Sequence, residues 1–162
     1  MRIAYGSDVG RKRAKNEDSV GNFKNRSNVV FVILADGLGG YQGGEVASEM
    51  AVSHLGYLFE QTELNNSNDA KVWLEEKLSC ENQMIIERSK QYQDLEGMGT
   101  TVVCAMFFEN KCLIAISATV AHIFCMIKNL YSLLKTILLS TSWSNEEKSV
   151  QMKQNTIRKK IL

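Results

Sequence analysis

The spacing of apolar residues along the chain predicts one long strand and two helices. A continuous, β-branched apolar run over 28–35 predicts a strand that is buried on both faces. Apolar residues recur at helical spacing over about 45–61 and again over about 70–92, so each segment is expected to form an amphipathic helix. The polar stretch 65–69 offers side chains that cap the start of the second helix.

Shorter strands are predicted on either side of these elements. Residues 1–9 and 20–23 have the pattern of short strands around a polar loop. After the helices, 100–108 and 111–116 are expected to form a hairpin with a tight turn. The order of strands, two helices and further strands favours an antiparallel α+β layer protein over alternating βαβ units.

The composition is that of a single globular domain. The chain has 162 residues, of which 44% are hydrophobic and 23% charged, which suits one core and excludes a disordered tail protein. With 19 Lys and Arg against 18 Asp and Glu, the net charge is +1, which argues against a nucleic-acid or membrane partner. The 4 cysteines form no CxxC pair and no secretory signal precedes them, so we expect reduced thiols in the cytoplasm.

Acidic side chains stand at the ends of the predicted strands. Glu17 and Asp18 close the first polar loop, and Asp36 follows the long apolar run directly. A carboxylate in such a place is costly unless it is exposed or bound to a cation. Carboxylate and carbonyl oxygens without nearby His or Cys suit Mg²⁺ or Mn²⁺, and the guanidinium of Arg13 suits a phosphate. For Asp36 alone, a solvated acid in a glycine-rich turn is the simpler interpretation.

Several other catalytic motifs do not occur in the sequence. Residues 37–42 lack the third glycine of a dinucleotide-binding loop, because Gln42 takes its place, and no Walker-type Gly-Lys-Ser/Thr follows. No cysteine has an arginine six residues later, which excludes a cysteine phosphatase. The basic run 11–13 is soon followed by Glu17 and Asp18, which favours a solvated or phosphate-facing loop over a nucleic-acid patch.

Three motifs together resemble the bacterial metal-dependent protein phosphatases of the PPM or PP2C type. They are Gly-Arg-Lys-Arg-Ala-Lys-Asn-Glu-Asp over 10–18, a segment over 36–48 that opens with Asp-Gly-Leu-Gly-Gly, and Gly-Met-Gly-Thr-Thr over 97–101. The resemblance implies an α-β-β-α layered sandwich with antiparallel sheets, in agreement with the predicted element order. It also implies hydrolysis of phosphoserine and phosphothreonine in proteins that a bacterial serine/threonine kinase has phosphorylated.

The resemblance also implies roles for individual residues. Asp18 and Asp36 would bridge two Mn²⁺ or Mg²⁺ ions. The carbonyl of Gly37 would assist directly and Glu17 would assist through a water molecule, while Arg13 would hold the phosphoryl group. Two cations lower the pKa of a bridging water that attacks phosphorus in line, so no protein nucleophile is required.

The resemblance ends near residue 116. Where the family continues with Gly-Asp-Ser-Arg-Ala-Tyr, this chain differs, yet a frame shifted by one base near codons 115–116 would permit that sequence. The segment 117–162 also contains no glycine, aspartate or proline, although a compact fold needs turn formers. We therefore predict two parts: 1–116, the N-terminal part of a PPM-type phosphatase domain, and 117–162, an out-of-frame tail that is not native to the fold.

Such a chain is expected to have an incomplete phosphatase fold. The family's other metal-binding aspartates lie beyond the shifted point, so Asp18 and Asp36 alone would leave two ions short of ligands. Half of the sandwich would also be missing, which would leave an apolar sheet face open. Two interpretations stay open: a monomeric, cytoplasmic phosphatase by descent that is inactive because it is truncated, or a non-catalytic remnant that binds metal or phosphoproteins.

Overall fold

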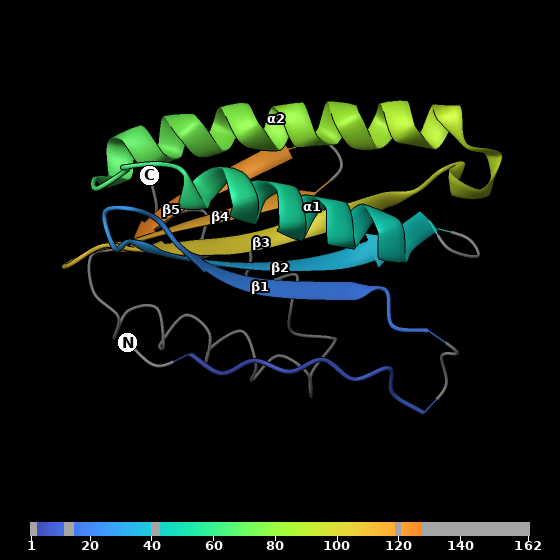
Figure 1. Cartoon of the computed structure of the whole chain (residues 1–162), viewed down its shortest axis with the longest axis horizontal. Helices are drawn as coiled ribbons and strands as arrows, with labels where there is room; N and C mark the ends of the chain where they lie inside the picture. Colours follow the sequence, from blue (N-terminus) through green and yellow to red (C-terminus); the bar gives the residue numbers. More distant parts are fainter. Residues whose placement is uncertain (1–2, 12–14, 40–42, 119–120, 128–162) are drawn as a thin grey trace, which may run out of the picture. The chain divides into compact units, whose positions relative to one another are not determined.

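An antiparallel sheet of five strands, with two helices on one of its faces, makes up most of the described structure (Figure 1). The computed structural model describes residues 3–11, 15–39, 43–118 and 121–127, which all belong to one compact unit. Neighbouring strands of the sheet follow one another in chain order. The strands are β1 (Asp18–Lys24), β2 (Val30–Leu38), β3 (Gly99–Phe107), β4 (Cys112–Ala118) and β5 (Ala121–Ile127).

Two helices connect β2 to β3, namely α1 (Gly43–Glu60) and α2 (Ser67–Gln91). Helix α1 lies against β1, β2 and β3, and α2 contacts α1, β3 and β4. The prediction of an antiparallel α+β protein is therefore confirmed. Among the described residues, neither of these helices nor the short turn of helix after α2 has the length and apolar character to span a membrane.

Helix α1 packs on the sheet through one apolar stripe. Its members recur every four residues, so they lie on one side of the helix. The fully buried residues of the stripe are Ala47, Ala51, Leu55 and Phe59. The helix predicted over about 45–61 is confirmed, and it begins two residues earlier than expected.

Helix α2 begins with a side-chain cap. The side-chain oxygen of Asn66 accepts hydrogen bonds from the N–H groups of Asn68 (3.1 Å) and Asp69 (3.0 Å). These bonds satisfy two of the donors that the start of a helix leaves unpaired. The cap predicted within 65–69 is thus confirmed, and it starts the helix at Ser67, earlier than the predicted residue 70.

The strand predicted over 28–35 exists as β2, but the prediction that it is buried on both faces is wrong. Along β2, buried and more accessible residues alternate. Phe31 and Ile33 are fully buried under the helices, whereas Leu34 is 49% exposed. In the described structure the helices cover one face of the sheet, so alternate side chains of β2 have no layer above them.

The strand predicted over 1–9 is also wrong for the residues that the structure describes. Residues 3–9 have no regular secondary structure, and residues 1–2 lie outside the described part. A strand needs a neighbour for its backbone N–H and C=O groups, and within the described residues β1 pairs only with β2. The strand predicted over 20–23 is confirmed as β1, which is longer than expected.

The predicted hairpin is confirmed as β3 and β4. Phe108 N–H donates to the Lys111 carbonyl across the turn, at 2.9 Å. The pairing then continues, because β5 lies antiparallel to β4 with Ala118 opposite Ala121. The sheet therefore extends past residue 116, while residues 128–162 of the predicted tail lie outside the described part. The proposed division at 116/117 stays a prediction.

An aromatic cluster joins both helices to the sheet. The ring of Phe31 on β2 lies 4.9 Å from that of Phe59 on α1 and 6.3 Å from that of Trp73 on α2. Phe59 and Trp73 are 5.8 Å apart in a T-shaped arrangement. Tilted and edge-on pairs of this kind are favourable beyond their buried area. The cluster holds α1 on β2. It thereby helps to position the end of β2 and the start of α1, where the polar residues lie.

A buried asparagine shapes the turn between β1 and β2. Asn25 is 4% exposed, and its side-chain oxygen accepts hydrogen bonds from Ser27 N–H (3.1 Å) and Val29 N–H (2.9 Å). Its amide group donates to the Leu64 carbonyl at 2.8 Å. Asn28 adopts the left-handed backbone conformation with φ 63°, which asparagine tolerates better than most residues. These contacts fix the length of the turn.

Candidate metal centre

Asp18 and Asp36 face each other across the first two strands. They are the first residue of β1 and the seventh of β2, and they are register partners. One residue away, Gly37 N–H donates to the Glu17 carbonyl at 3.1 Å, so Glu17 and Gly37 form a hydrogen-bonded pair. Hydrogen-bonded and non-hydrogen-bonded pairs alternate in an antiparallel ladder, and the latter bring side chains closer, with Cα atoms about 4.5 Å apart. The two carboxylates are therefore neighbours.

The acid pair lies on the face of the sheet that the helices do not cover. Along β2, Ile33 and Ala35 are buried beneath α1, so Leu34 and Asp36 point the opposite way. Thr101 of β3 is the next register partner of Asp36. Both aspartates are exposed to solvent. Like charges directly opposite each other destabilise a sheet, which indicates that the pair serves a purpose other than stability.

Glycine at position 37 allows the end of β2 to touch the start of α1. A Cβ atom on Gly37 would lie 2.1 Å from the Gly44 carbonyl oxygen and 2.6 Å from that of Glu17, so no side chain fits there. In an antiparallel ladder the N–H and C=O of one residue point to the same side. The Gly37 carbonyl therefore points toward β1.

Ser48 of α1 holds the loop that precedes β1. Its hydroxyl is completely buried, donates to the Glu17 carbonyl at 2.7 Å, and lies 3.2 Å from the hydroxyl of Ser19. No role for Ser48 is expected from the sequence, although Ser48 ends the second motif of the resemblance. A small polar residue on the apolar stripe of the predicted helix was the available signal.

Glu17 differs from the two aspartates in its placement. Successive residues of a strand point to opposite faces, so the Glu17 side chain points to the helix side of the sheet. Its Cδ atom lies 3.1 Å from the place that a Cβ of Gly44 would occupy. The carboxylate is thus next to the first turn of α1, where a negative charge is favourable. Arg13 lies outside the described residues.

Two further contacts hold the aspartates by their backbone. Asp18 N–H donates to the side-chain oxygen of Asn16 at 3.1 Å, and the Thr100 hydroxyl donates to the Asp36 carbonyl at 3.0 Å. Asn16 and Thr100 belong to the first and third motifs of the resemblance. All three motifs therefore meet at this end of the sheet.

The donors at this site are oxygens of the kind that Mg²⁺ and Mn²⁺ prefer. Among the described residues, no group of three or more His, Cys, Asp or Glu side chains could hold a metal ion. Burial raises the pKa of the Cys104 thiol on β3 to about 12, so this cysteine is not a thiolate ligand. The two carboxylates and the Gly37 carbonyl fit one hard divalent cation that keeps most of its water, and fall short of ligands for two.

Comparison with known proteins identifies the family. Residues 6–119 match the family model described as Protein phosphatase 2C, so the chain belongs to that family. A putative protein phosphatase 2C-type of Streptococcus pyogenes is 40% identical over 123 residues, which are 76% of this chain and 47% of the relative. The chain spans about half the length of the curated relatives that it matches.

Solved structures agree in fold. Serine/threonine phosphatase Stp1 from Staphylococcus aureus superposes with a TM-score of 0.65 at 30% identity, over 86% of this chain and 57% of that one. The catalytic domain of the serine/threonine protein phosphatase PstP, determined in complex with 2 manganese ions, gives a TM-score of 0.58 at 33% identity. That match covers 68% of this chain and 45% of PstP.

Proposed function

We propose that this chain carries the first part of the metal site of a protein serine/threonine phosphatase. The observation that supports it is the register pair Asp18 and Asp36 on the sheet face opposite the helices. Relatives of this chain are named as phosphatases of this kind, and PstP holds two manganese ions. The substrates would be phosphoproteins, with a bacterial serine/threonine kinase supplying the phosphate groups, in the cytoplasm and with the chain as a monomer.

Each polar residue of the site has a distinct task in this proposal. Asp18 and Asp36 would hold the cation, the Gly37 carbonyl would add a neutral oxygen, and Glu17 would assist through a water molecule. Arg13 orients the phosphoryl group through its planar guanidinium. The bound cation supplies a water of lowered pKa and neutralises the charge that develops on the phosphate.

The 162-residue chain by itself is expected to bind metal weakly and to lack phosphatase turnover. Two carboxylates and one carbonyl leave most of the positions around a Mg²⁺ or Mn²⁺ ion to water. In-line attack needs the cations and the phosphate to be fixed together. This donor count favours the second candidate function, a non-catalytic binder of metal or phosphoprotein, for the isolated chain. It also accords with the proposed division into 1–116 and 117–162.

Manganese titration of the purified chain tests the proposed site. We expect binding, followed by calorimetry or by the electron paramagnetic resonance of free Mn²⁺, to be lost in Asp18→Asn and Asp36→Asn. Asp94→Asn is the matched control, because Asp94 is exposed and lies in the short helical turn after α2. Unchanged binding in Asp36→Asn would refute the metal site.

Hydrolysis of a phosphothreonine peptide, measured with the same proteins and Mn²⁺, tests the incomplete site separately. No hydrolysis above the protein-free rate is expected. Turnover that disappears in Asp36→Asn but not in Asp94→Asn would support the phosphatase and contradict the expected loss of activity.

A further inference from the structure

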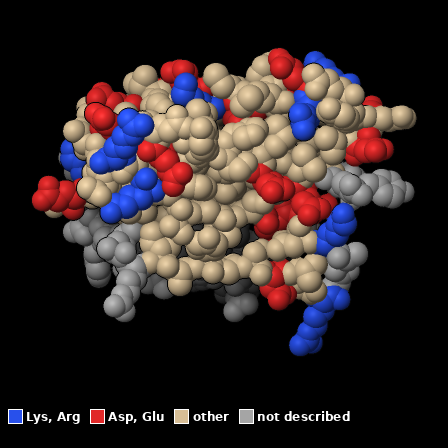
Figure 2. All heavy atoms as spheres, viewed as in Figure 1, with Lys and Arg blue, Asp and Glu red and all other residues tan. Residues whose placement is uncertain are grey.

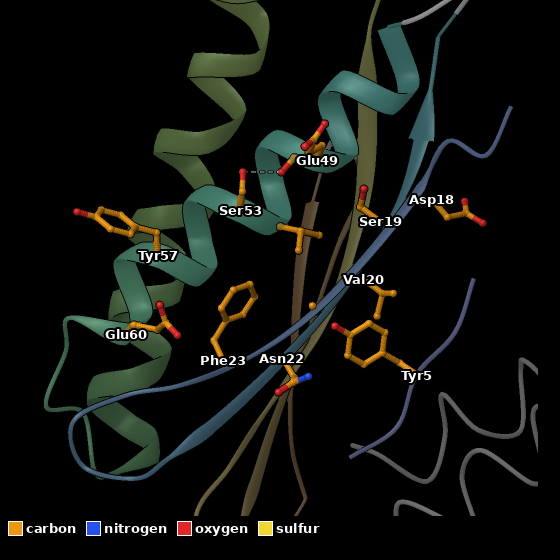
Figure 3. A pocket seen from close by; sticks show the side chains of 12 residues that line it. Tyr5, Asp18, Ser19, Val20, Asn22, Phe23, Glu49, Ser53, Tyr57 and Glu60 are labelled. Atoms are coloured by element: carbon orange, nitrogen blue, oxygen red, sulfur yellow. Dashed lines mark hydrogen bonds between the residues drawn. The ribbon is translucent and has the colours of Figure 1, made fainter. Parts of the chain in front are cut away.

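A hollow runs along the edge of β1 that faces away from β2, and Asp18 of the metal pair is among its lining residues. Its volume is about 540 Å³. Helix α1 forms one wall and the segment that contains Tyr5 forms the other, with the edge of β1 between them (Figure 3). Phe23 and Val52 contribute apolar surface, and Glu49 and Glu60 of α1 contribute carboxylates. We call this hollow the β1-edge groove.

The floor of the groove presents backbone groups that have no strand partner within the described structure. Because the Gly37 N–H bonds to Glu17, odd-numbered residues of β1 direct their N–H and C=O toward β2. The N–H and C=O of Val20 and Asn22 then point away from the sheet, into the groove. Among the described residues no strand lies on this side of β1. Such an edge is a template for an added strand.

The charge around the groove has one sign. Asp18, Glu49 and Glu60 line it, and no Lys, Arg or His is among its lining residues. Within the described residues, no ion pair neutralises these three carboxylates. Figure 2 shows a broad uncharged area across the middle of this side of the molecule, with both acidic and basic side chains around it. An occupant with positive charge would be attracted.

We propose that the β1-edge groove binds an extended, basic peptide segment of a partner protein as an added strand. The peptide backbone pairs with Val20 and Asn22, an apolar side chain packs on Phe23, and Lys or Arg side chains approach Glu49 and Glu60. A second copy of this chain is the poorer occupant, because edge-to-edge pairing would bring two acidic grooves together. Of the proposed metal ligands only Asp18 lines the groove, so binding here does not require phosphatase activity.

A fluorescent decapeptide of alternating Lys and Val, titrated against the full chain at low salt, tests the charge. Glu49→Gln with Glu60→Gln is expected to weaken binding by about fivefold, since each exposed ion pair contributes roughly 0.2–1 kcal/mol. The control pair is Glu63→Gln with Glu109→Gln, two exposed acids outside the groove with the same change in net charge. Equal weakening in both pairs would overturn the proposal in favour of unspecific attraction.

A second measurement tests strand addition. The same peptide with alternate backbone nitrogens methylated keeps its charge but cannot pair as a strand, so it is expected not to bind. Amide exchange of Val20 and Asn22 is expected to slow when the unmodified peptide is added. Binding of the methylated peptide, or protection of these amides through dimerisation without any peptide, would overturn the proposal. The Mn²⁺ titration is expected to be the same for the Glu49/Glu60 variant, which separates this test from that of the proposed function.

Discussion

The two faces of the sheet differ in what their side chains do. On the helix side, Phe31 and Ile33 are completely buried and the aromatic cluster closes over them. On the opposite side, Leu34, Val103 and Ile116 are 49%, 40% and 43% exposed. These three residues are register partners and form a row across β2, β3 and β4.

The acid pair stands directly beside this exposed row. Asp18 precedes Val20 by two positions and Asp36 follows Leu34 by two positions, so each lies on the same face as its neighbour. The helix side therefore supplies the stability of the unit, and the other side can hold two like charges because water reaches them. The proposed metal site therefore lies on the less buried face of the sheet, and paired substitutions can test this difference between the two faces.

The largest difference is expected between two neighbours on β2. Ile33→Ala should lower the free energy of unfolding by about 2–5 kcal/mol, because it opens a cavity under the helices. Leu34→Ala, on the exposed face, should cost less than about 1 kcal/mol. Urea denaturation followed by circular dichroism measures both. If Ile33→Ala does not fold, Ile33→Val with about 0.5–1.5 kcal/mol replaces it. Equal losses at 33 and 34 would remove the distinction between the faces.

A smaller loss of stability is expected from a substitution at Gly37, where the end of β2 touches the start of α1. Gly37→Ala should cost about 1–3 kcal/mol, because its Cβ would overlap the Gly44 carbonyl and force β2 away from the helix. Gly99→Ala is the matched control, since no atom lies within 4 Å of its added Cβ. Thermal unfolding of the two variants provides the measurement. A Gly37→Ala protein as stable as the control would contradict the close contact described here.

A gain in stability is expected at the acid pair when metal is removed. Asp36→Asn should stabilise the chain in EDTA by about 0.2–1 kcal/mol, because it relieves the repulsion across the strands. Mn²⁺ should then raise the melting temperature of the wild type but not that of the variant. Asp94→Asn should change neither value. A loss of stability in EDTA would mean that the carboxylates are not opposed in the way that the register implies.

The smallest effect concerns a buried carboxylate between the two helices. Glu81 is 3% exposed and both of its oxygens lie 3.1 Å from His54 Nδ1. Burial raises the pKa of Glu81, and the neighbouring His54 only partly opposes this. The folded chain thus holds the proton more tightly than the unfolded chain, whose glutamate titrates near the usual value of about 4.3.

The stability that Glu81 contributes is therefore complete below that pH, and it falls as the pH rises through the raised value. Glu81→Gln cannot ionise, so its stability relative to the wild type should increase from pH 4 toward pH 7. Urea midpoints at several pH values measure this difference. A difference that shrinks as the pH rises would mean that the ion pair with His54 outweighs the burial of the charge.

Much of the fold follows from local patterns in the sequence. The helix stripes, the cap at Asn66 and the hairpin of β3 and β4 depend on residues close together in the chain, and all three are predicted. The burial of β2 on only one face is not predicted. A continuous apolar run indicates that a strand can be covered on both faces, but it does not show that both covering layers are present. Whether a second layer exists depends on residues far from β2 in sequence.

The candidate site is predicted in part for the same reason. Asp18 and Asp36 are conspicuous because each stands at the end of an apolar strand. Their direct opposition is a property of how β1 and β2 pair, which no local pattern specifies. The positions of Ser48 and Gly44 depend in turn on how α1 lies on that pair, so their contacts with Glu17 and Gly37 become evident only in the folded molecule.

The Asn25 turn lies at the far end of the hairpin from the aspartates. Its length nevertheless determines whether the two aspartates lie opposite each other. The seven residues of β1 span about 23 Å, and every pairing along them is counted from this turn. One residue inserted or deleted between Asn25 and Val29 would slip the alignment and send one aspartate to the helix side. The hairpin loop thus sets the spacing of the proposed metal centre, and an engineered variant should keep its length as strictly as it keeps the carboxylates.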